Sequence, residues 1–81
     1  MTRIAKIKSN NLSTIFGGIL DCIDNGNLNK AEVDVLVSLK SDTRIIAGRA
    51  IASYAKAALD ILGIEKCRDD IDAERLVKEF A

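Results

Sequence analysis

The sequence predicts an all-α fold: a small helical bundle built on an antiparallel helix hairpin, with a long, alanine-rich second helix. Alanine, leucine and isoleucine, which favour helices, are abundant in the 81-residue chain, aromatic residues are few, and proline is absent. Apolar residues also recur at helical spacing over most of the chain. Residues 1–81 suffice for one small domain, and because such domains often complete their core by self-association, we expect a homo-oligomer.

The first part of the chain, residues 1–11, is a basic N-terminal arm that contains Arg3, Lys6 and Lys8 and no acidic residue. Whether this arm is helical, extended as a strand, or disordered is left open by its sequence. The first helix of the hairpin is predicted from 12 to 25, and the asparagine pair directly before it is suited to cap a helix start.

A glycine pair, Gly17 and Gly18, lies inside this predicted helix. Each glycine costs about 1 kcal/mol relative to alanine in a helix interior, so the pair needs a structural reason. We interpret it as a place where the backbone of another helix approaches closely. Room for a ligand and a break in the helix are the two alternatives.

The stretch DCIDNGNLNKAE, residues 21–32, has the length, the central Gly26 and the final Glu32 of a calcium-binding EF-hand loop. Its third position is Ile23, which has no oxygen to offer a metal ion, so no metal site is predicted. The same residues fit a corner between two helices. Gly26 is suited to end the first helix, and Asn29 with Glu32 resembles the capping box that starts a second one.

The second helix is predicted from 29 to 62, followed by Gly63, a residue suited to a helix C-terminus. A kink is expected near 41–43, because serine, aspartate and threonine side chains compete for local backbone hydrogen bonds. Whether the helix is broken there is left open. Small residues predominate from 47 to 58, which favours close packing on more than one side. A short C-terminal helix is predicted from 72 to 80, with Asp72 as its N-cap.

The residues required for most catalytic chemistry are missing or isolated. The chain has no histidine, and Cys22 and Cys67 have no activating partner nearby in the sequence. Two isolated cysteines do not suit zinc, and the glycine pair is not followed by the lysine of a P-loop. We therefore expect a protein that is not an enzyme and uses no cofactor.

Charge and hydropathy narrow the possible partners. Twelve basic residues balance twelve acidic ones, so the net charge does not favour nucleic acid. No signal peptide is evident, and the apolar runs are shorter than the ~20 residues needed to span a bilayer. These observations predict a cytoplasmic protein without membrane contact.

The predicted long helix carries cationic residues that indicate an anion site. Arg49 and Lys56 share one face at helical spacing, and Arg44 comes within reach if a neighbouring helix or subunit brings it there. Arginine forks suit phosphate groups, and Tyr54 is suited to stack on a base. The predicted ligand-binding residues, in a pocket between subunits, are therefore Arg44, Arg49, Tyr54 and Lys56. The alternative is an ordinary solvated helix face.

Residues 12–63 resemble a group of short helical proteins encoded by temperate phages and prophages. The resemblance rests on the turn NGNLNKAE, residues 25–32, and on the tract YAKAALDILG, residues 54–63. The two arginines in the middle of the predicted long helix, Arg44 and Arg49, are not part of that pattern. The resemblance implies a mobile-element accessory protein that acts in the host cytoplasm without catalysis.

Three functions follow as expectations. The first is sequestration of a phosphate-bearing, nucleotide-like ligand, or inhibition of a host defence protein, by a homo-oligomeric helical scaffold. The second is a small DNA-binding regulator that uses Arg3, Lys6 and Lys8. Its affinity for DNA is expected to fall as the salt concentration rises. The third is a protein–protein interaction module that docks through the acidic C-terminal region.

Overall fold

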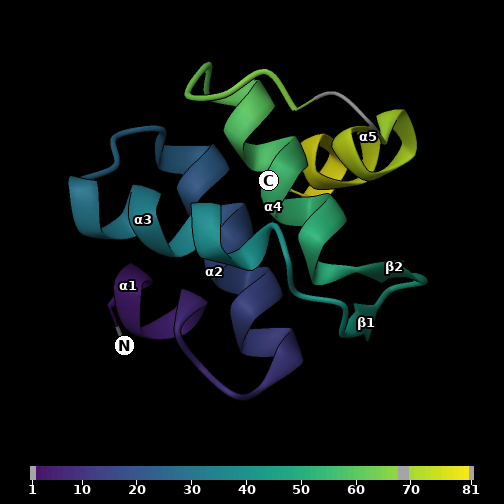
Figure 1. The fold of residues 1–81 in the computed structure, drawn as a ribbon, viewed down its shortest axis with the longest axis horizontal. Coiled ribbons are helices and arrows are strands. Elements are labelled where there is room, and N and C mark those ends of the chain that lie inside the picture. The colour runs from purple at the N-terminus through teal and green to yellow at the C-terminus, as the bar shows by residue number, and fades with distance from the viewer. Residues whose placement is uncertain (1, 68–69, 81) are drawn as a thin grey trace.

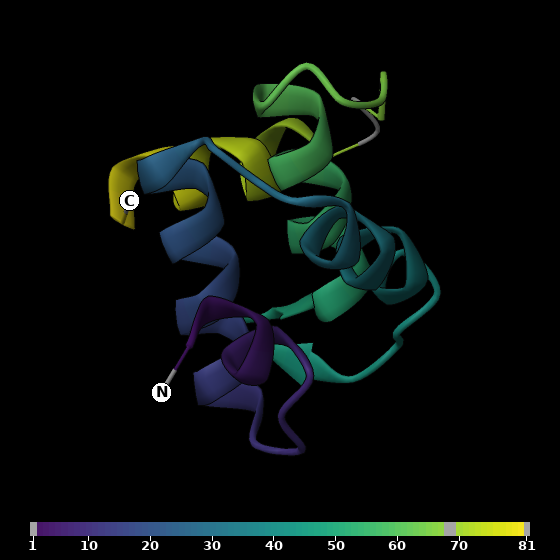
Figure 2. The ribbon, with the colours of Figure 1, turned by 90° about the vertical axis from the view of Figure 1, so that its left-hand side faces the viewer.

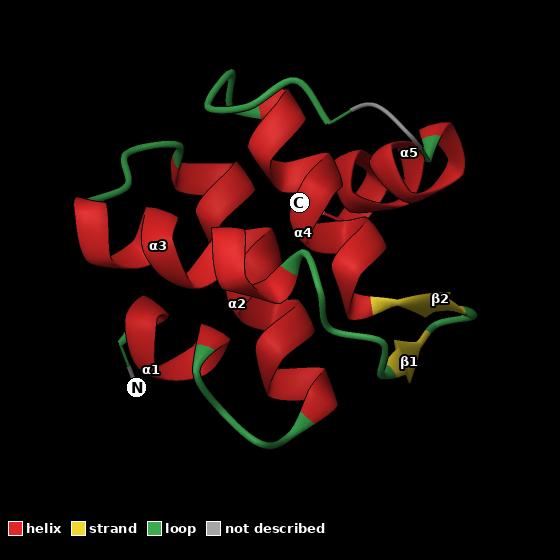
Figure 3. Cartoon of the chain, viewed as in Figure 1, coloured by secondary structure: helices red, strands yellow, loops and turns green. Residues whose placement is uncertain are grey.

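The computed structural model describes residues 2–67 and 70–80, and these are mostly helical (Figure 1). In chain order the elements are α1 (Arg3–Ile7), α2 (Leu12–Asn25), α3 (Lys30–Leu39), β1 (Ile45–Ile46), β2 (Arg49–Ala50), α4 (Ile51–Ile61) and α5 (Ile71–Phe80). The two strands pair as a small antiparallel hairpin (Figure 3). The helical character predicted from the sequence is confirmed, with this hairpin as an addition.

The core is organised around α4, which packs on α2, α3 and α5. Two views related by a 90° rotation show α4 in the middle of the molecule, with the other helices around it (Figures 1 and 2). Its small side chains allow several helices to approach it, as the alanine-rich tract suggested. The buried side chains that α4 contributes are Ile51, Tyr54, Ala55, Ala57, Ala58 and Leu59.

The predicted helix over 29–62 is in fact two helices, α3 and α4, separated by residues 40–50. The break falls in the segment where a kink was expected. After α3 ends, the Asp42 carboxylate accepts a hydrogen bond from the backbone N–H of Arg44 at 3.0 Å. The side chain thereby takes the place of a backbone carbonyl as acceptor, which disfavours a continuing helix. The expected packing of the two helices against each other as an antiparallel hairpin is not confirmed. The main contacts of α2 and of α3 are with α1 and α4, and not with each other.

A two-residue turn joins the strands that interrupt the predicted long helix. Ala47 and Gly48 have φ values of 52° and 81°, both in the left-handed region, as a type I′ hairpin turn requires. Alanine is rare at such a position and favours helices, so the sequence gives a weak signal for this turn. The hairpin was therefore missed in favour of a continuous helix.

The corner between α2 and α3 is confirmed as a capped turn. Gly26 ends α2 with φ of 72°, and its N–H donates to the Cys22 carbonyl at 2.9 Å. The capping box is complete: Glu32 N–H donates to Asn29 Oδ1 at 2.9 Å, and Asn29 N–H donates to Glu32 Oε1 at 3.0 Å.

The N-terminal arm forms a short separate helix, α1, which packs on α2 at Gly18. A Cβ atom added at Gly18 would lie 2.8 Å from Ile7 Cγ2 and from Lys6 Cβ, so only glycine allows this approach. A Cβ added at Gly17 would meet nothing within 4 Å. The interpretation of the pair as a close helix contact is thus confirmed for Gly18. Asn11 caps the start of α2, accepting from Thr14 N–H at 3.1 Å.

The C-terminal helix, α5, begins at Ile71 and not at 72. Its cap is Asp70, whose Oδ1 accepts from Ala73 N–H at 3.0 Å. The N-cap role predicted for Asp72 is therefore wrong, because the earlier aspartate is in register with the first free N–H groups and Asp72 lies inside the first turn.

We expect Gly18→Ala to lower the free energy of unfolding by about 1–3 kcal/mol, because α1 must move away from α2 to admit the methyl group. Gly17→Ala is the matched control and should raise it by about 0.5–1 kcal/mol, since its methyl group meets no neighbour. Urea denaturation followed by circular dichroism measures both. Equal effects of the two substitutions would contradict the close contact.

We expect Ala47→Gly to stabilise the protein by about 1 kcal/mol, because glycine relieves the left-handed backbone at this residue. In a continuous helix the same substitution would cost about 1 kcal/mol, so the sign distinguishes the two structures. Gly48→Ala adds a Cβ atom at the next residue, whose backbone is also left-handed, and should be destabilising. Thermal unfolding of the three chains is a sufficient measurement.

Candidate functional site

Arg49 and Tyr54, two of the four predicted ligand-binding residues, lie at the β-hairpin. The Arg49 guanidinium donates from Nη1 to Asp70 Oδ2 at 2.8 Å and from Nη2 to Asp72 Oδ2 at 3.0 Å. The Tyr54 side chain is fully buried. Its hydroxyl group donates to two carbonyl oxygens of the hairpin, 3.0 Å and 3.1 Å away, which share the single proton. Burial raises the Tyr54 pKa. This ring is a structural part of the core and is not presented for stacking.

Arg44 and Lys56, the other two, occupy different surroundings. Arg44 lies in the loop before β1 and forms a bidentate ion pair with Asp42, whose pKa is lowered chiefly by that hydrogen bond. Lys56 lies half-buried on α4. Each of the two arginines is thus paired with carboxylates of this chain, and a phosphate group would have to displace them.

The basic arm proposed for DNA binding is largely paired as well. Lys6 Nζ lies 2.6 Å from Asp21 Oδ2 on α2, and Arg3 is paired with Glu32 on α3. Lys8 is exposed. Two of the three cations in α1 and its flank therefore hold helices together, which reduces the positive field that this arm presents to solvent.

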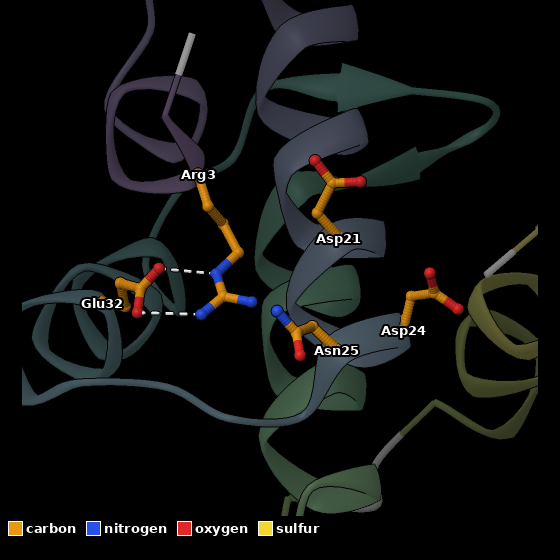
Figure 4. A pocket seen from close by; sticks show the side chains of 5 residues that line it. All are labelled: Arg3, Asp21, Asp24, Asn25 and Glu32. Carbon is orange, nitrogen blue, oxygen red and sulfur yellow. Dashed lines mark hydrogen bonds and ion pairs between the residues drawn. The ribbon is translucent and has the colours of Figure 1, made fainter.

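An open cleft of about 530 Å³ lies where α1, α2 and α3 meet (Figure 4). Helix α1 contributes Arg3, the end of α2 contributes Asp21, Asp24 and Asn25, and α3 contributes Glu32. The capped corner at Gly26 places these residues together, because it turns the chain directly after Asn25 and starts α3 close by. This cleft is the candidate functional site.

The Arg3–Glu32 pair fixes one wall of the cleft. Arg3 Nε and Nη2 donate to the two Glu32 oxygens at 2.5 Å and 3.0 Å, and Nη2 also donates to the Asn27 carbonyl at 2.7 Å. The two side chains are only 17% and 8% exposed. The hydrogen bonds from Arg3 and then from the Asn29 backbone hold the pKa of Glu32 below its usual range.

The third guanidinium nitrogen of Arg3, Nη1, is directed away from Glu32 and toward the α2 side of the cleft, near Asn25 (Figure 4). Within residues 2–67 and 70–80 it donates no hydrogen bond. Because the other two nitrogens are held, Nη1 is a donor in a fixed position that a ligand oxygen can reach.

The opposite wall is negatively charged. Asp21 and Asp24 lie near the C-terminal end of α2, where the helix dipole disfavours negative charge, and the last turn has no basic residue. Lys6 compensates Asp21, but in the part of the chain that the structure describes Asp24 forms no ion pair. The cleft therefore combines one fixed donor with carboxylates that favour a cation.

Sequence reasoning missed this site because residues of the cleft that pair with each other come from distant parts of the chain. Arg3 and Glu32 are 29 residues apart, and no local pattern links them. The available signal was an arginine in the basic N-terminal arm, together with a glutamate that the sequence had already assigned to a capping box.

The buried thiol of Cys22 is unsuited to nucleophilic chemistry. Its side chain is fully buried in the core, and burial raises its pKa to about 11. Over the described ranges, no group of three or more histidine, cysteine, aspartate or glutamate side chains is arranged to hold a metal ion. In the same residues, no helix has the length and apolar character needed to cross a membrane.

We expect Glu32→Gln to lower the free energy of unfolding at neutral pH by about 1–3 kcal/mol, because it removes the charge that Arg3 and the cap hydrogen-bond. The Glu32 pKa is depressed in the folded state, so its contribution is complete above the unfolded pKa of about 4.3 and is lost as pH falls through the folded pKa. The two proteins should therefore converge in stability in strong acid. Asp34→Asn, at an exposed site on the same helix, is the control and should change little. A constant difference at all pH values would contradict this role.

Comparison of the chain with protein-family models, with curated proteins and with solved structures finds no match. The resemblance to phage accessory proteins therefore stays a hypothesis, based on residues 25–32 and 54–63. Functional inference accordingly depends on the geometry of the cleft.

Proposed function

We propose that this protein acts without catalysis, by binding a basic segment of another protein in the cleft between α1, α2 and α3. The observation that supports this is the composition of the cleft, which is lined by Asp21 and Asp24 of α2 and by Arg3, an arginine that Glu32 and Asn27 hold in place. In an accessory protein of the kind the resemblance implies, the partner would be a host defence component.

The two walls suit two groups of one peptide. A lysine or arginine side chain would lie beside Asp24, where its positive charge is attracted by this carboxylate and by the negative pole of α2, while Asp21 stays paired with Lys6. A backbone carbonyl of the same segment would accept from Arg3 Nη1. An exposed ion pair contributes at most about 1 kcal/mol, so the affinity is expected to be modest and to fall as salt screens the charges.

A phosphate-bearing ligand is less well supported. The carboxylates of the cleft repel phosphate, and Arg49 is engaged by Asp70 and Asp72 on the other side of the molecule. DNA binding through the basic arm meets a similar obstacle, since Lys6 and Arg3 are paired with Asp21 and Glu32. Both earlier expectations require these pairs to open.

We expect a fluorescein-labelled oligolysine peptide to bind the protein, and Asp24→Asn to weaken binding about fivefold, as the loss of one ion pair predicts. Fluorescence anisotropy at low and at moderate salt measures this. Asp34→Asn removes the same charge from an exposed site outside the cleft and is the matched control.

Equal binding by the Asp24→Asn and Asp34→Asn chains would show that the cleft is not the site. A nucleotide that raises the melting temperature of the wild-type protein, but not of an Arg49→Gln chain, would favour the sequestering function instead.

A further inference from the structure

The side of α2 that is turned away from the core carries a row of four residues, which we call the outer ridge. Ser13, Gly17, Leu20 and Asp24 follow one another at intervals of four, three and four residues, so they lie along one side of the helix. Ser13 and Asp24 are exposed, and Gly17 and Leu20 are half-buried. Figure 2 shows α2 along one edge of the molecule, with α3 and α4 on its inner side.

Gly17 forms a notch in the outer ridge that the monomer does not fill. A Cβ atom added at Gly17 would meet no atom of the described residues within 4 Å, whereas one added at Gly18 would collide with α1. Glycine in a helix interior is destabilising relative to alanine, so Gly17 has no structural reason within the single chain. Leu20, the next residue of the ridge, supplies an apolar side chain of the kind that a notch in a facing helix accepts.

The charges of α2 are arranged against its own dipole. Asp21 and Asp24 lie near the C-terminal end, the last turn has no basic residue, and the first turn has no acidic residue. Asp21 is paired with Lys6, but Asp24 forms no ion pair in the part of the chain that the structure describes. An antiparallel helix alongside α2 would bring its positive N-terminus to Asp24, so both ends of α2 favour such a neighbour.

Two aromatic rings extend the apolar surface beside the outer ridge. Phe16 lies one turn before Leu20 and is half-buried. Phe80 of α5 meets Phe16 edge-on, with the ring centroids 6.3 Å apart, and is 61% exposed. A neighbour that covers the ridge would therefore also remove aromatic surface from water.

We propose that the outer ridge is the interface of a symmetric homodimer, in which α2 of one copy packs antiparallel to α2 of the other. With the two-fold axis midway between Gly17 and Leu20, the Leu20 side chain of each copy fills the notch at Gly17 of the other. Asp24 of each copy then lies beside Ser13, in the first turn of the other α2.

The outer ridge fits a second copy because a two-fold interface must be complementary to itself. Here the apolar side chain matches the notch, and the unpaired acid matches the positive pole of the same helix in the other copy. One pair of helices buries less than the about 800 Å² per partner of a standard interface, so the dimer is weak and forms at high protein concentration.

The dimer covers Asp24 and therefore competes with the basic segment that we propose for the cleft. This competition rests on the proposed function, whereas the interface itself does not. Gly17 and Leu20 lie outside the cleft, so the two sites can be changed separately.

Disulfide trapping tests the antiparallel register. One full-length chain carries Ser13→Cys and the other Asp24→Cys, both with Cys67→Ser, since Cys67 is only half-buried while Cys22 is buried. The oxidised 1:1 mixture should contain a linked heterodimer of twice 8.8 kDa. Each chain alone should stay unlinked, because its own thiol and that of its copy lie at opposite ends of the interface, roughly 16 Å apart.

An Asp34→Cys chain is the matched control, because Asp34 is an exposed aspartate on α3, outside the outer ridge. Its mixture with the Ser13→Cys chain should give no excess of heterodimer. Linked homodimers of the Ser13→Cys chain would indicate parallel helices, and equal yields with Asp24→Cys and Asp34→Cys would indicate random collision. Either result would overturn the proposal.

Sedimentation equilibrium of Gly17→Ala separates the interface from the fold. The wild-type mass should rise from 8.8 kDa toward twice that value as the concentration approaches about 1 mM. Gly17→Ala should weaken the dimer about tenfold, because the methyl group occupies the notch. The same substitution should stabilise the diluted monomer, so a general loss of stability cannot imitate this result.

Oligolysine binding by the Gly17→Ala chain should equal that of the wild type at dilution, because Asp24 and the cleft are unchanged. A wild-type chain that stays at 8.8 kDa at high concentration, or a Gly17→Ala chain that dimerises equally well, would refute the interface. A wild-type dimer that traps the 13–24 disulfide but binds no oligolysine would support the interface and reject only the proposed function.

Discussion

The carboxylate of Glu32 is the point on which the N-terminal half of this protein depends. It accepts two hydrogen bonds from Arg3 of α1 and one from the backbone of Asn29, the cap of its own helix. A buried charge of this kind is stable only while its partners are present. Because one carboxylate serves both partners, the packing of α1, the turn after α2 and the start of α3 are coupled. The cleft exists because of this coupling.

A second arginine plays a comparable part in the C-terminal half. Arg49 connects the hairpin to the start of α5 through ion pairs, and the buried Tyr54 hydroxyl donates a hydrogen bond to the same hairpin from the core. The hairpin thus lies between the core and the last helix. The hairpin therefore has a structural role although Ala47 in its turn lies in the left-handed region of the backbone, at φ of 52°.

The parts of the fold that the sequence revealed are those governed by neighbours in the chain. The turn at Gly26, the capping box and the helical character of α2 and α5 depend on residues within four positions of each other. The hairpin was missed because Ala47 and Gly48 lack the Asn-Gly signature, and helix-forming residues surround them. The candidate site was missed for a different reason. Pairs such as Arg3 with Glu32 form only after the helices pack, and spacing cannot show them.

Pairing also decides which charges remain for a partner. The position of the arginines in the sequence suggested that they would meet an anion, yet Arg3, Arg44 and Arg49 are each paired with acids of this chain. An ion pair must be broken before either member can bind a ligand. These cations therefore stabilise the fold and are not available to a ligand without that cost. Asp24, which forms no ion pair within the described residues, and the free edge of the Arg3 guanidinium carry no such cost. A balanced charge count therefore does not show which charges stay without a partner after folding, and the proposal of a basic partner depends on the carboxylate of Asp24.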